Sequence, residues 1–207
     1  MTPPADPAAP LSSASPRLLV LASTSPYRRE LLARLRLPFD VQASHVDESA
    51  QPGETPRMLA LRLAAEKARA VAARYPDAVV IGSDQVAELG GEALGKPGSH
   101  DNAVRQLQRM QGRSIVFHTA LTVCCHALGF EQSDVAAVRV QVRPLDDAAI
   151  ERYLRAEQPY DCAGSAKSEG LGIALLDTID SDDPTALVGL PLIRCCRMLR
   201  AAGFELP

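Results

Sequence analysis

The chain has 207 residues, 46% of them hydrophobic, which is enough to bury the core of one large domain. Its formal net charge of -3 excludes a protein that binds nucleic acid through a general basic surplus. No apolar run approaches the roughly 20 residues that span a bilayer, and residues 1–16 lack the basic start and apolar segment of a secretory signal. We therefore expect a cytoplasmic protein with no membrane partner, a disordered tail at residues 1–16 and one domain at residues 17–207.

Two residue types are used unevenly. Only three of the 22 basic residues are lysines, at 67, 96 and 167, so each lysine is a candidate for a position that requires a compact ammonium; the alternative is chance. The five cysteines include two adjacent pairs and no CxxC spacing, which favours buried, reduced thiols over a metal or disulfide role.

The first predicted elements are a strand and a helix joined by a sharp turn. Residues 17–22 form an apolar run of strand length, and Ser25 and Pro26 fit the cap and first position of a helix whose leucine stripe continues to about Leu37. Such a turn presents free backbone N–H groups and the positive end of the helix dipole, which together favour an anion.

Arg28 and Arg29 lie in the first turn of that helix, where cations are unfavourable unless an anion is bound close by. The sequence therefore favours phosphate binding at this turn. The alternative is that both arginines simply point into solvent.

A second helix follows a polar loop that carries Asp47 and Glu48. Thr55 and Pro56 fit the cap and first residue of this helix, and Lys67 lies within it. Taken alone, a lysine at that position is usually solvated.

A buried strand is predicted at residues 78–81, where it runs into Gly82 and Asp84. A carboxylate at the end of a buried strand is a common place for a catalytic acid in α/β enzymes, because the strand fixes the side chain and the glycine admits a ligand. A Gly-Gly hairpin then brings Lys96 back toward Asp84. The alternative for Lys96 is a surface turn.

The rest of the chain continues to mix helices and strands. Ser99 caps a third helix, two long strands form a hairpin near residues 128–130, and a fourth helix covers residues 146–158. A Gly- and Ser-rich loop with Lys167 and Glu169 leads into a last strand and a final helix. We therefore expect a mixed sheet. The GxSxG, Walker, HExxH and GxGxxG motifs are absent.

A series of motifs occurs in one order between about residues 17 and 200: LASTSPYRRELL, VDES, EKA, IGSDQV, GKP, CAGSAKSEGLG and LVGLPL. Together they resemble the Maf family of nucleoside triphosphate pyrophosphatases. The resemblance implies a two-lobed α/β fold like that of inosine triphosphatases, with a long curved mixed β-sheet flanked by helices and a cleft between the lobes. It also implies a divalent metal cofactor (Mg²⁺ or Mn²⁺), a homodimer, and cleavage of a nucleoside triphosphate to the monophosphate and diphosphate.

The resemblance also assigns roles to residues of this chain. Asp84 falls on the proposed proton acceptor and Glu48 on an acid that we assign to the metal. The phosphate contacts fall on Ser23, Arg28, Arg29, Lys67 and Lys96. These residue types suit attack of water at the α-phosphorus, because Arg, Lys and Mg²⁺ neutralise phosphate charge. Whether Asp84 deprotonates the water or holds the metal stays open.

Three residues resemble the subgroup that acts on 7-methyl-GTP: Tyr27 after Ser-Pro, Gln85 after the acid, and Glu169 in Lys-Ser-Glu-Gly. Tyr27 departs from the tryptophan that is frequent there. Guanine offers adjacent N1–H and N2–H donors that a carboxylate such as Glu169 can accept, and its N7-methylated form is a cation that suits an aromatic face. Without the resemblance, Tyr27 would cover the helix start and Glu169 would be a loop acid.

Other functions stay open. The protein could clear further modified or non-canonical nucleotides, or act on dTTP and UTP as another Maf subgroup does. It could also be a nucleotide-binding regulator of septum formation, although an intact set of catalytic residue types argues against binding alone.

Overall fold

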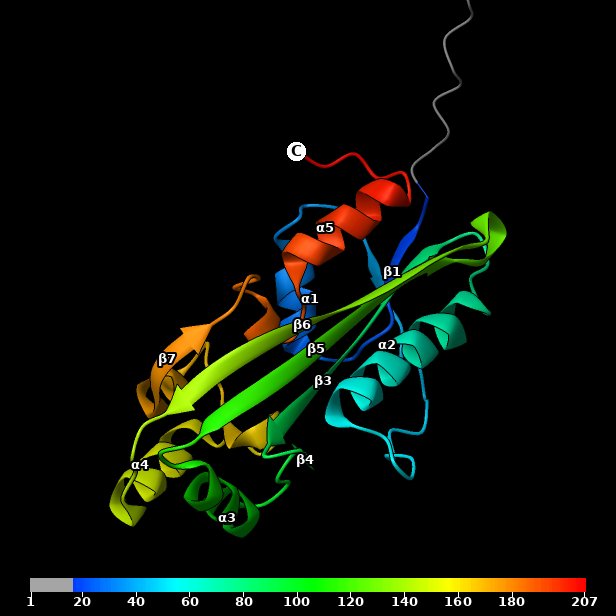
Figure 1. Cartoon of the computed structure of the whole chain (residues 1–207). Coiled ribbons are helices and arrows are strands. Elements are labelled where there is room, and N and C mark those ends of the chain that lie inside the picture. Colours follow the sequence, from blue (N-terminus) through cyan, green and yellow to red (C-terminus); the bar gives the residue numbers. More distant parts are fainter. Residues whose placement is uncertain (1–16) are drawn as a thin grey trace, which may run out of the picture.

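The computed structural model describes residues 17–207, so the tail predicted at residues 1–16 lies outside the described residues. A mixed seven-stranded sheet with flanking helices makes up the domain (Figure 1). Its strands are β1 (Leu19–Leu21), β2 (Asp40–Val41), β3 (Val79–Leu89), β4 (Glu92–Leu94), β5 (Ser114–Cys125), β6 (Phe130–Val142) and β7 (Leu176–Asp180). Its α-helices are α1 (Pro26–Ala33), α2 (Pro56–Ala72), α3 (His100–Met110), α4 (Asp147–Glu157) and α5 (Leu192–Ala201). None of the helices in the described range is long and apolar enough to cross a membrane.

The strands lie in the order β2-β1-β3-β5-β6-β7, and β4 pairs with β3 outside this path. β1 runs parallel to β2 and β3, whereas the pairs that involve β4, β5, β6 and β7 are antiparallel. The predicted mixed sheet is therefore confirmed. The hairpin β5–β6 turns at Gly129, whose φ of 59° is the left-handed conformation that glycine adopts without strain.

The edge of β3 that faces β1 has a gap. β5 pairs with the opposite edge of β3 along residues 80–88. β1 and β4 therefore both pair with the edge described here. β1 lies beside residues 79–81, and β4 lies beside residues 87–89. Residues 82–86 have no strand partner there among the described residues. Because Leu21 pairs with Ile81 in parallel and Leu94 pairs with Ala87 in antiparallel, both strands point their carboxyl ends into this gap.

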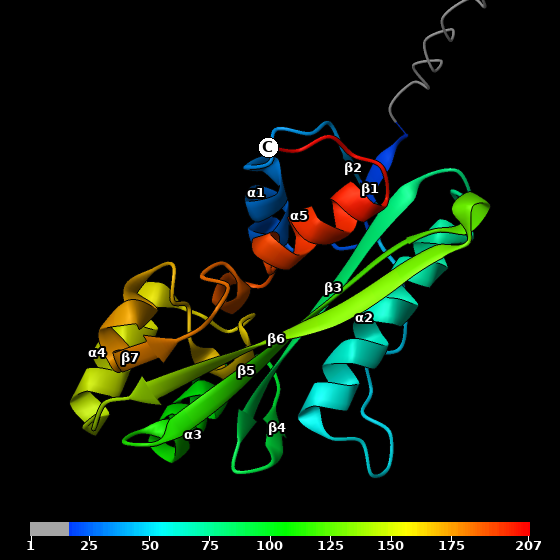
Figure 2. The same ribbon diagram turned by 45° about the horizontal axis from the view of Figure 1, so that its top comes forward.

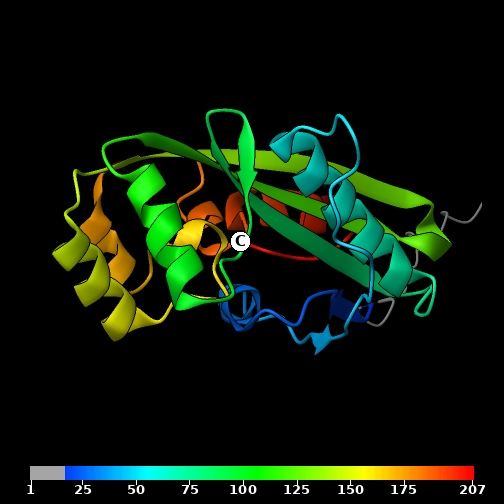
Figure 3. The same cartoon turned by 90° about the horizontal axis from the view of Figure 1, so that it is seen from below.

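The two faces of the sheet are covered differently. Figures 1 and 2 show α2 on one side of the long strands and α1 with α5 on the other. One apolar cluster joins α1 and α5 to side chains such as Ile81 and Val123, and a second joins α3 and α4 to Phe117 and Val138. Because side chains alternate along a strand, both clusters lie on the face away from α2, at opposite ends of the long strands. In Figure 3, α3 and α4 lie at one end of the long strands, and α2 lies toward the other end. The two clusters are separate cores on one face of the sheet.

The local signals confirm most predicted elements. Ser25, Thr55 and Ser99 cap their helices, since each side-chain oxygen accepts a backbone N–H three residues on. Two boundaries were wrong. The helix expected to reach Leu37 ends at Ala33, because the chain tightens into i to i+3 turns and reaches a left-handed residue at Arg36 (φ 56°).

The second boundary is that of β3. The strand was expected to end at Ile81, but it continues to Leu89 because β5 pairs with it throughout. Asp84 therefore lies in the middle of a long strand and not beyond its end.

The five cysteines are free thiols, as predicted. Cys124, Cys125 and Cys195 are buried, whereas Cys162 and Cys196 are partly exposed and so depart from the prediction of burial.

Candidate functional site

The gap beside β3 holds a buried ion pair. Asp84 and Lys67 are both more than nine-tenths buried, and Lys67 Nζ lies 2.7 Å from Asp84 Oδ1. The same ammonium lies 2.5 Å from Glu48 Oε1. Two carboxylates from separate parts of the chain thus share one lysine, in agreement with the idea that this lysine needs a compact ammonium.

Gly82 brings Lys67 to Asp84. A Cβ at Gly82 would lie 2.6 Å from Ala68 N and 2.8 Å from Ala68 Cβ, so α2 can approach β3 this closely only above a glycine. The sequence led us to expect that this glycine makes room for a ligand. The space is instead filled by the backbone of α2. This helix carries Lys67, whose side chain reaches Asp84, the next residue of β3 on the same face as Gly82.

Arg28 and Ser23 occupy the turn that leaves β1. Arg28 donates from Nε to the carbonyl oxygen of Gly189 at 2.9 Å and from a terminal nitrogen to Ser23 Oγ at 3.3 Å. Burial lowers the pKa of the Arg28 guanidinium, while the charges of Asp84 and Glu48 act in the opposite direction. Two acids therefore stabilise a half-buried cation at the N-terminus of α1.

The pKa of Glu48 depends on the cations around the gap. Burial alone would raise the pKa of Glu48. The hydrogen bond and charge of Lys67 outweigh that effect, together with the charges of Lys96 and Arg28, and keep this pKa below its ordinary value. Lys96 follows β4 and is exposed. The charge of Lys96 thus acts on Glu48, whereas its predicted return toward Asp84 stays a prediction.

Arg29 differs from the other predicted phosphate contacts. Its side chain is exposed and forms no hydrogen bond or ion pair within residues 17–207. Of the two arginines in the first turn of α1, only Arg28 is built into the site.

A polar band separates the two apolar clusters on the face opposite α2. Gln85 Nε2 donates to the carbonyl oxygens of Ala186 and Leu187, both at 3.0 Å, and Thr119 Oγ1 donates to Ala186 O at 2.8 Å. Ser83 Oγ lies 3.1 Å from Gly189 O. These side chains fix the segment 186–189 across the middle of the sheet. Gln85, predicted to contribute to base specificity, is therefore bonded through its amide nitrogen to this segment.

Tyr27 faces the Gly- and Ser-rich loop. Lys167 Nζ lies 5.7 Å from the centroid of the Tyr27 ring, and Cys162 Sγ lies 4.0 Å from the Tyr27 hydroxyl. Burial raises the pKa of Tyr27 to about 12 and that of Cys162 to about 12, so both groups are neutral at physiological pH. The structure thus brings the aromatic residue of the first turn beside the loop that carries Glu169.

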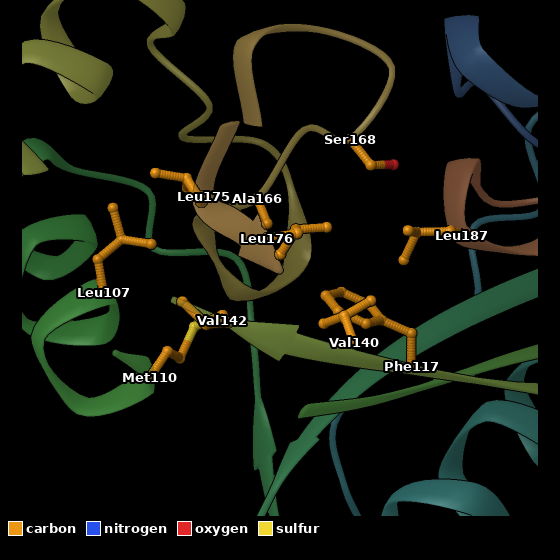
Figure 4. A pocket seen from close by; sticks show the side chains of 10 residues that line it. All are labelled: Leu107, Met110, Phe117, Val140, Val142, Ala166, Ser168, Leu175, Leu176 and Leu187. Carbon is orange, nitrogen blue, oxygen red and sulfur yellow. The ribbon is translucent and has the colours of Figure 1, made fainter. Parts of the chain in front are cut away.

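Glu169 is exposed as a residue, yet partial burial of its carboxyl raises its pKa, which the charge of Lys167 opposes. A small apolar pocket lies beneath the same loop, bordered by Ala166, Ser168 and Leu187 (Figure 4). Its free volume is about 10 Å³, which suits at most one water molecule. The pocket is therefore too small for an aromatic ring.

Metal ligands are few near the gap. No group of three or more His, Cys, Asp and Glu side chains gathers in residues 17–207 in a way that could hold a metal ion. Glu48 and Asp84 are nevertheless two hard-oxygen donors around one ammonium. This set fits Mg²⁺, which is commonly held by one or two carboxylates together with substrate phosphates and water.

Two features of the site escaped the sequence reasoning. Asp183 is fully buried, and its Oδ2 accepts the N–H of Ile193 at 2.9 Å, so it caps α5 and anchors the segment that Gln85 holds. Glu157, at the end of α4, pairs with Lys167 at 2.8 Å. Asp183 stands in an Asp-Asp-Pro-Thr run that is typical of turns and caps, which is a weak signal for a capping role. Glu157 is the acid nearest the end of the fourth predicted helix, which is a weak signal for a contact with the loop that follows.

Comparison with known proteins identifies the family. The family model described as "Maf-like protein" matches residues 18–202. A 7-methyl-GTP pyrophosphatase from Albidiferax ferrireducens is 69% identical over 189 residues, which cover 91% of this chain and 95% of the relative. Relatives of the same name from Polaromonas sp. and Burkholderia pseudomallei are 69% and 62% identical and cover 92% and 93% of this chain, and 87% and 91% of their own length. A solved nucleoside-triphosphatase / dITP/XTP pyrophosphatase from Mycobacterium abscessus gives a TM-score of 0.42 at 14% identity, covering 91% of this chain and 100% of that chain, and supports no conclusion. From the family match and the high identity over nearly the whole chain, the protein belongs to the Maf family.

Proposed function

We propose that this protein hydrolyses 7-methyl-GTP to the monophosphate and diphosphate. The observation that carries the chemistry is the group of Lys67, Asp84 and Glu48 at the gap, with Arg28 beside it. The base assignment is supported by relatives at 69% identity that bear the name 7-methyl-GTP pyrophosphatase.

The cations of the site hold the triphosphate. Lys67 and Arg28 are fixed by burial and hydrogen bonds, so they can neutralise phosphate charge without reorganising during the reaction. Lys96, which is exposed at the end of β4, contacts the phosphates from the other side of the gap. Ser23 and the N–H groups at the start of α1 complete the phosphate contacts, and Arg29 contributes long-range attraction only.

Asp84 orients the attacking water. Its Oδ1 accepts from Lys67, and Oδ2 is free of hydrogen bonds to the described residues, so it can accept a hydrogen bond from water. The water oxygen bonds to the α-phosphorus, its proton passes to Asp84, and the bond to the bridging oxygen breaks to release diphosphate. A divalent cation bound with the substrate would be held by Glu48 and Asp84 and would stabilise negative charge on the phosphate oxygens.

Tyr27 and Glu169 recognise the base. The N7-methylated guanine carries a positive charge, so the face of Tyr27 and the carboxylate of Glu169 both favour it over neutral bases. A cation over an aromatic ring contributes roughly 2- to 30-fold in selectivity, depending on how well water is excluded. Gln85 acts on specificity indirectly, through the segment 186–189 that it holds.

The wider setting belongs to the same proposal. We place the enzyme in the cytoplasm as a homodimer that removes a modified nucleotide. The outer edge of β7 is free of a strand partner in the described residues and exposes Ile179, and we assign this edge to the subunit contact. Light scattering after size exclusion gives the mass directly, and a monomer would overturn the dimer.

The experiment that tests the function is diphosphate release with Mg²⁺ from 7-methyl-GTP, GTP, dTTP, UTP, CTP and ITP, with Asp84→Asn as the inactive control. We expect the highest kcat/KM for 7-methyl-GTP. Preference for dTTP and UTP would keep the reaction but overturn the base assignment. No release from any nucleotide, together with tight nucleotide binding, would support a regulator instead.

A further inference from the structure

Glu157 reaches into the loop that carries Glu169. It is the last residue of α4, and its side chain is only 13% exposed. Oε1 lies 2.8 Å from Lys167 Nζ, and Oε2 accepts the N–H of Leu171 at 2.7 Å. The helix dipole disfavours a carboxylate at this end of a helix. The position of Glu157 therefore depends on these two partners, which lie on either side of Glu169 in the chain.

Gly170 lies directly against the same carboxylate. A Cβ at Gly170 would lie 2.7 Å from Glu157 Oε2 and 2.8 Å from Oε1. Any larger residue would have to push the carboxylate away. The carboxylate of Glu157 therefore contacts the loop at three places: the ammonium of Lys167, the Cα of Gly170 and the N–H of Leu171.

α4 fixes the start of the loop as well. The hydroxyl of Tyr153 donates to the carbonyl oxygen of Ser165 at 3.1 Å and accepts the N–H of Lys167 at 3.1 Å. Tyr153 and Glu157 are four residues apart and therefore lie on one face of the helix. One helix face thus holds the loop at two successive points.

The charge of Lys167 connects Glu157 to base recognition. Lys167 lies over the ring of Tyr27 and also acts electrostatically on Glu169. If the ammonium of Lys167 lacked its partner Glu157, it would turn to Glu169 and would repel a cationic base at Tyr27. We propose that Glu157 is a positioning residue for base recognition, which neutralises Lys167 and fixes the backbone beside Gly170 so that Glu169 stays available to the base. This inference rests on the proposed function, in which Tyr27 and Glu169 face the base.

The test compares Glu157→Gln, Glu157→Ala, Gly170→Ala and the double variant Glu157→Ala/Gly170→Ala. The matched control is Glu151→Gln on the same helix, whose carboxylate pairs with His100 and Arg155 and does not contact the loop. Steady-state kinetics with 7-methyl-GTP and GTP give the base preference. Hydrogen exchange at the amide of Leu171 measures the contact without any substrate.

In Glu157→Gln we expect kcat/KM for 7-methyl-GTP to fall about 5- to 10-fold, mainly through KM, with a change of about 2-fold or less for GTP. Gly170→Ala should act like Glu157→Ala, and the double variant should be no worse than either single one, because both changes remove the same contact. The Leu171 amide should exchange faster in Glu157→Ala and Gly170→Ala, and Glu151→Gln should match the wild type.

An unchanged ratio between the two nucleotides in Glu157→Gln and Gly170→Ala would overturn the inference, as would additive costs in the double variant. Failure of the proposed function looks different. If the wild type prefers a pyrimidine nucleotide, the base assignment is wrong, and the positioning role is then judged by whether Glu157→Gln weakens that other preference.

Discussion

A Cβ at Gly82 on β3 would lie 2.2 Å from the carbonyl oxygen of Ala64 on α2. Backbone atoms cannot yield as a side-chain tip can, so Gly82→Ala must push α2 away from the sheet. We expect a loss of about 2–3 kcal/mol in the free energy of unfolding, measured by urea denaturation. The ion pair of Lys67 and Asp84 should loosen with it, so kcat should also fall. Gly95→Ala is the control, because a Cβ there meets no atom within 4 Å.

The buried pair of Lys67 and Asp84 gives a second prediction. Lys67→Met leaves Asp84 buried without its cation and should cost about 3 kcal/mol of stability, because removing one partner of a buried pair strands the other. Asp84→Asn should cost less, since Lys67 keeps Glu48 as a partner. Diphosphate release should be lost in both. Denaturation curves separate the two effects, and equal stability of the two variants would contradict this account.

Acid should loosen the loop that carries Glu48. Arg62 donates to Glu54 Oε1 at 2.7 Å and to the carbonyl oxygen of Ser49 at 2.9 Å, so it ties this loop to α2. The hydrogen bond from Arg62 lowers the pKa of Glu54 from its ordinary value of 4.5 to about 2. The folded state therefore holds this proton less tightly than the unfolded chain.

The resulting stability is complete above pH 4.5 and is lost as the pH falls toward 2. Glu54→Gln should be less stable than the wild type at neutral pH and should show a flatter decline over this range. Urea midpoints at several pH values measure it. A parallel decline in wild type and variant would show that another group is responsible.

Asp183 offers a test of the segment between β7 and α5. Asn in its place would turn its NH2 group either toward the N–H of Ile193 or toward the backbone N–H of Thr185, so one buried bond must be lost. We expect Asp183→Asn to cost about 2 kcal/mol. Asp182→Asn changes the neighbouring, exposed partner of Arg194 and should have little effect on thermal unfolding. A larger effect at Asp182 than at Asp183 would exclude the capping role.

Local chemistry was predictable from the sequence. The caps at Ser25, Thr55 and Ser99 each depend on residues a few positions apart, and all three were identified. Val138, Val140 and Val142 alternate in the sequence, which is typical of a strand with one buried face, and all three valines are buried. Such signals involve residues only a few positions apart and do not depend on the elements that pack against them.

Features that depend on distant partners were not predictable. β3 continues past Gly82 to Glu88 because it pairs there with residues of β5 that lie 28 to 40 positions later in the chain. The role of Gly82 depends on α2, and that of Gly170 depends on Glu157. A lone sequence shows that a glycine is present but not which backbone or carboxylate requires it. The predicted roles of Ser23, Arg28, Lys67, Lys96 and Glu48 came from the family resemblance and remain to be tested by mutation.

The gap beside β3 also separates main-chain features, which mutations leave unchanged, from side chains, which mutations change. Val79 N–H and Ile81 C=O point toward β1, so by strand alternation the main-chain groups of Ser83 and Gln85 point into the gap. The orientation of these amide and carbonyl groups does not depend on which side chains stand there, and those of Ser83 are fully buried. Under the proposed function, changes at Tyr27 or Glu169 would therefore alter which base is preferred, while the main chain of β3 stays the same. We therefore expect the nucleotide preference to respond to substitutions at these two positions without a change in the sheet edge.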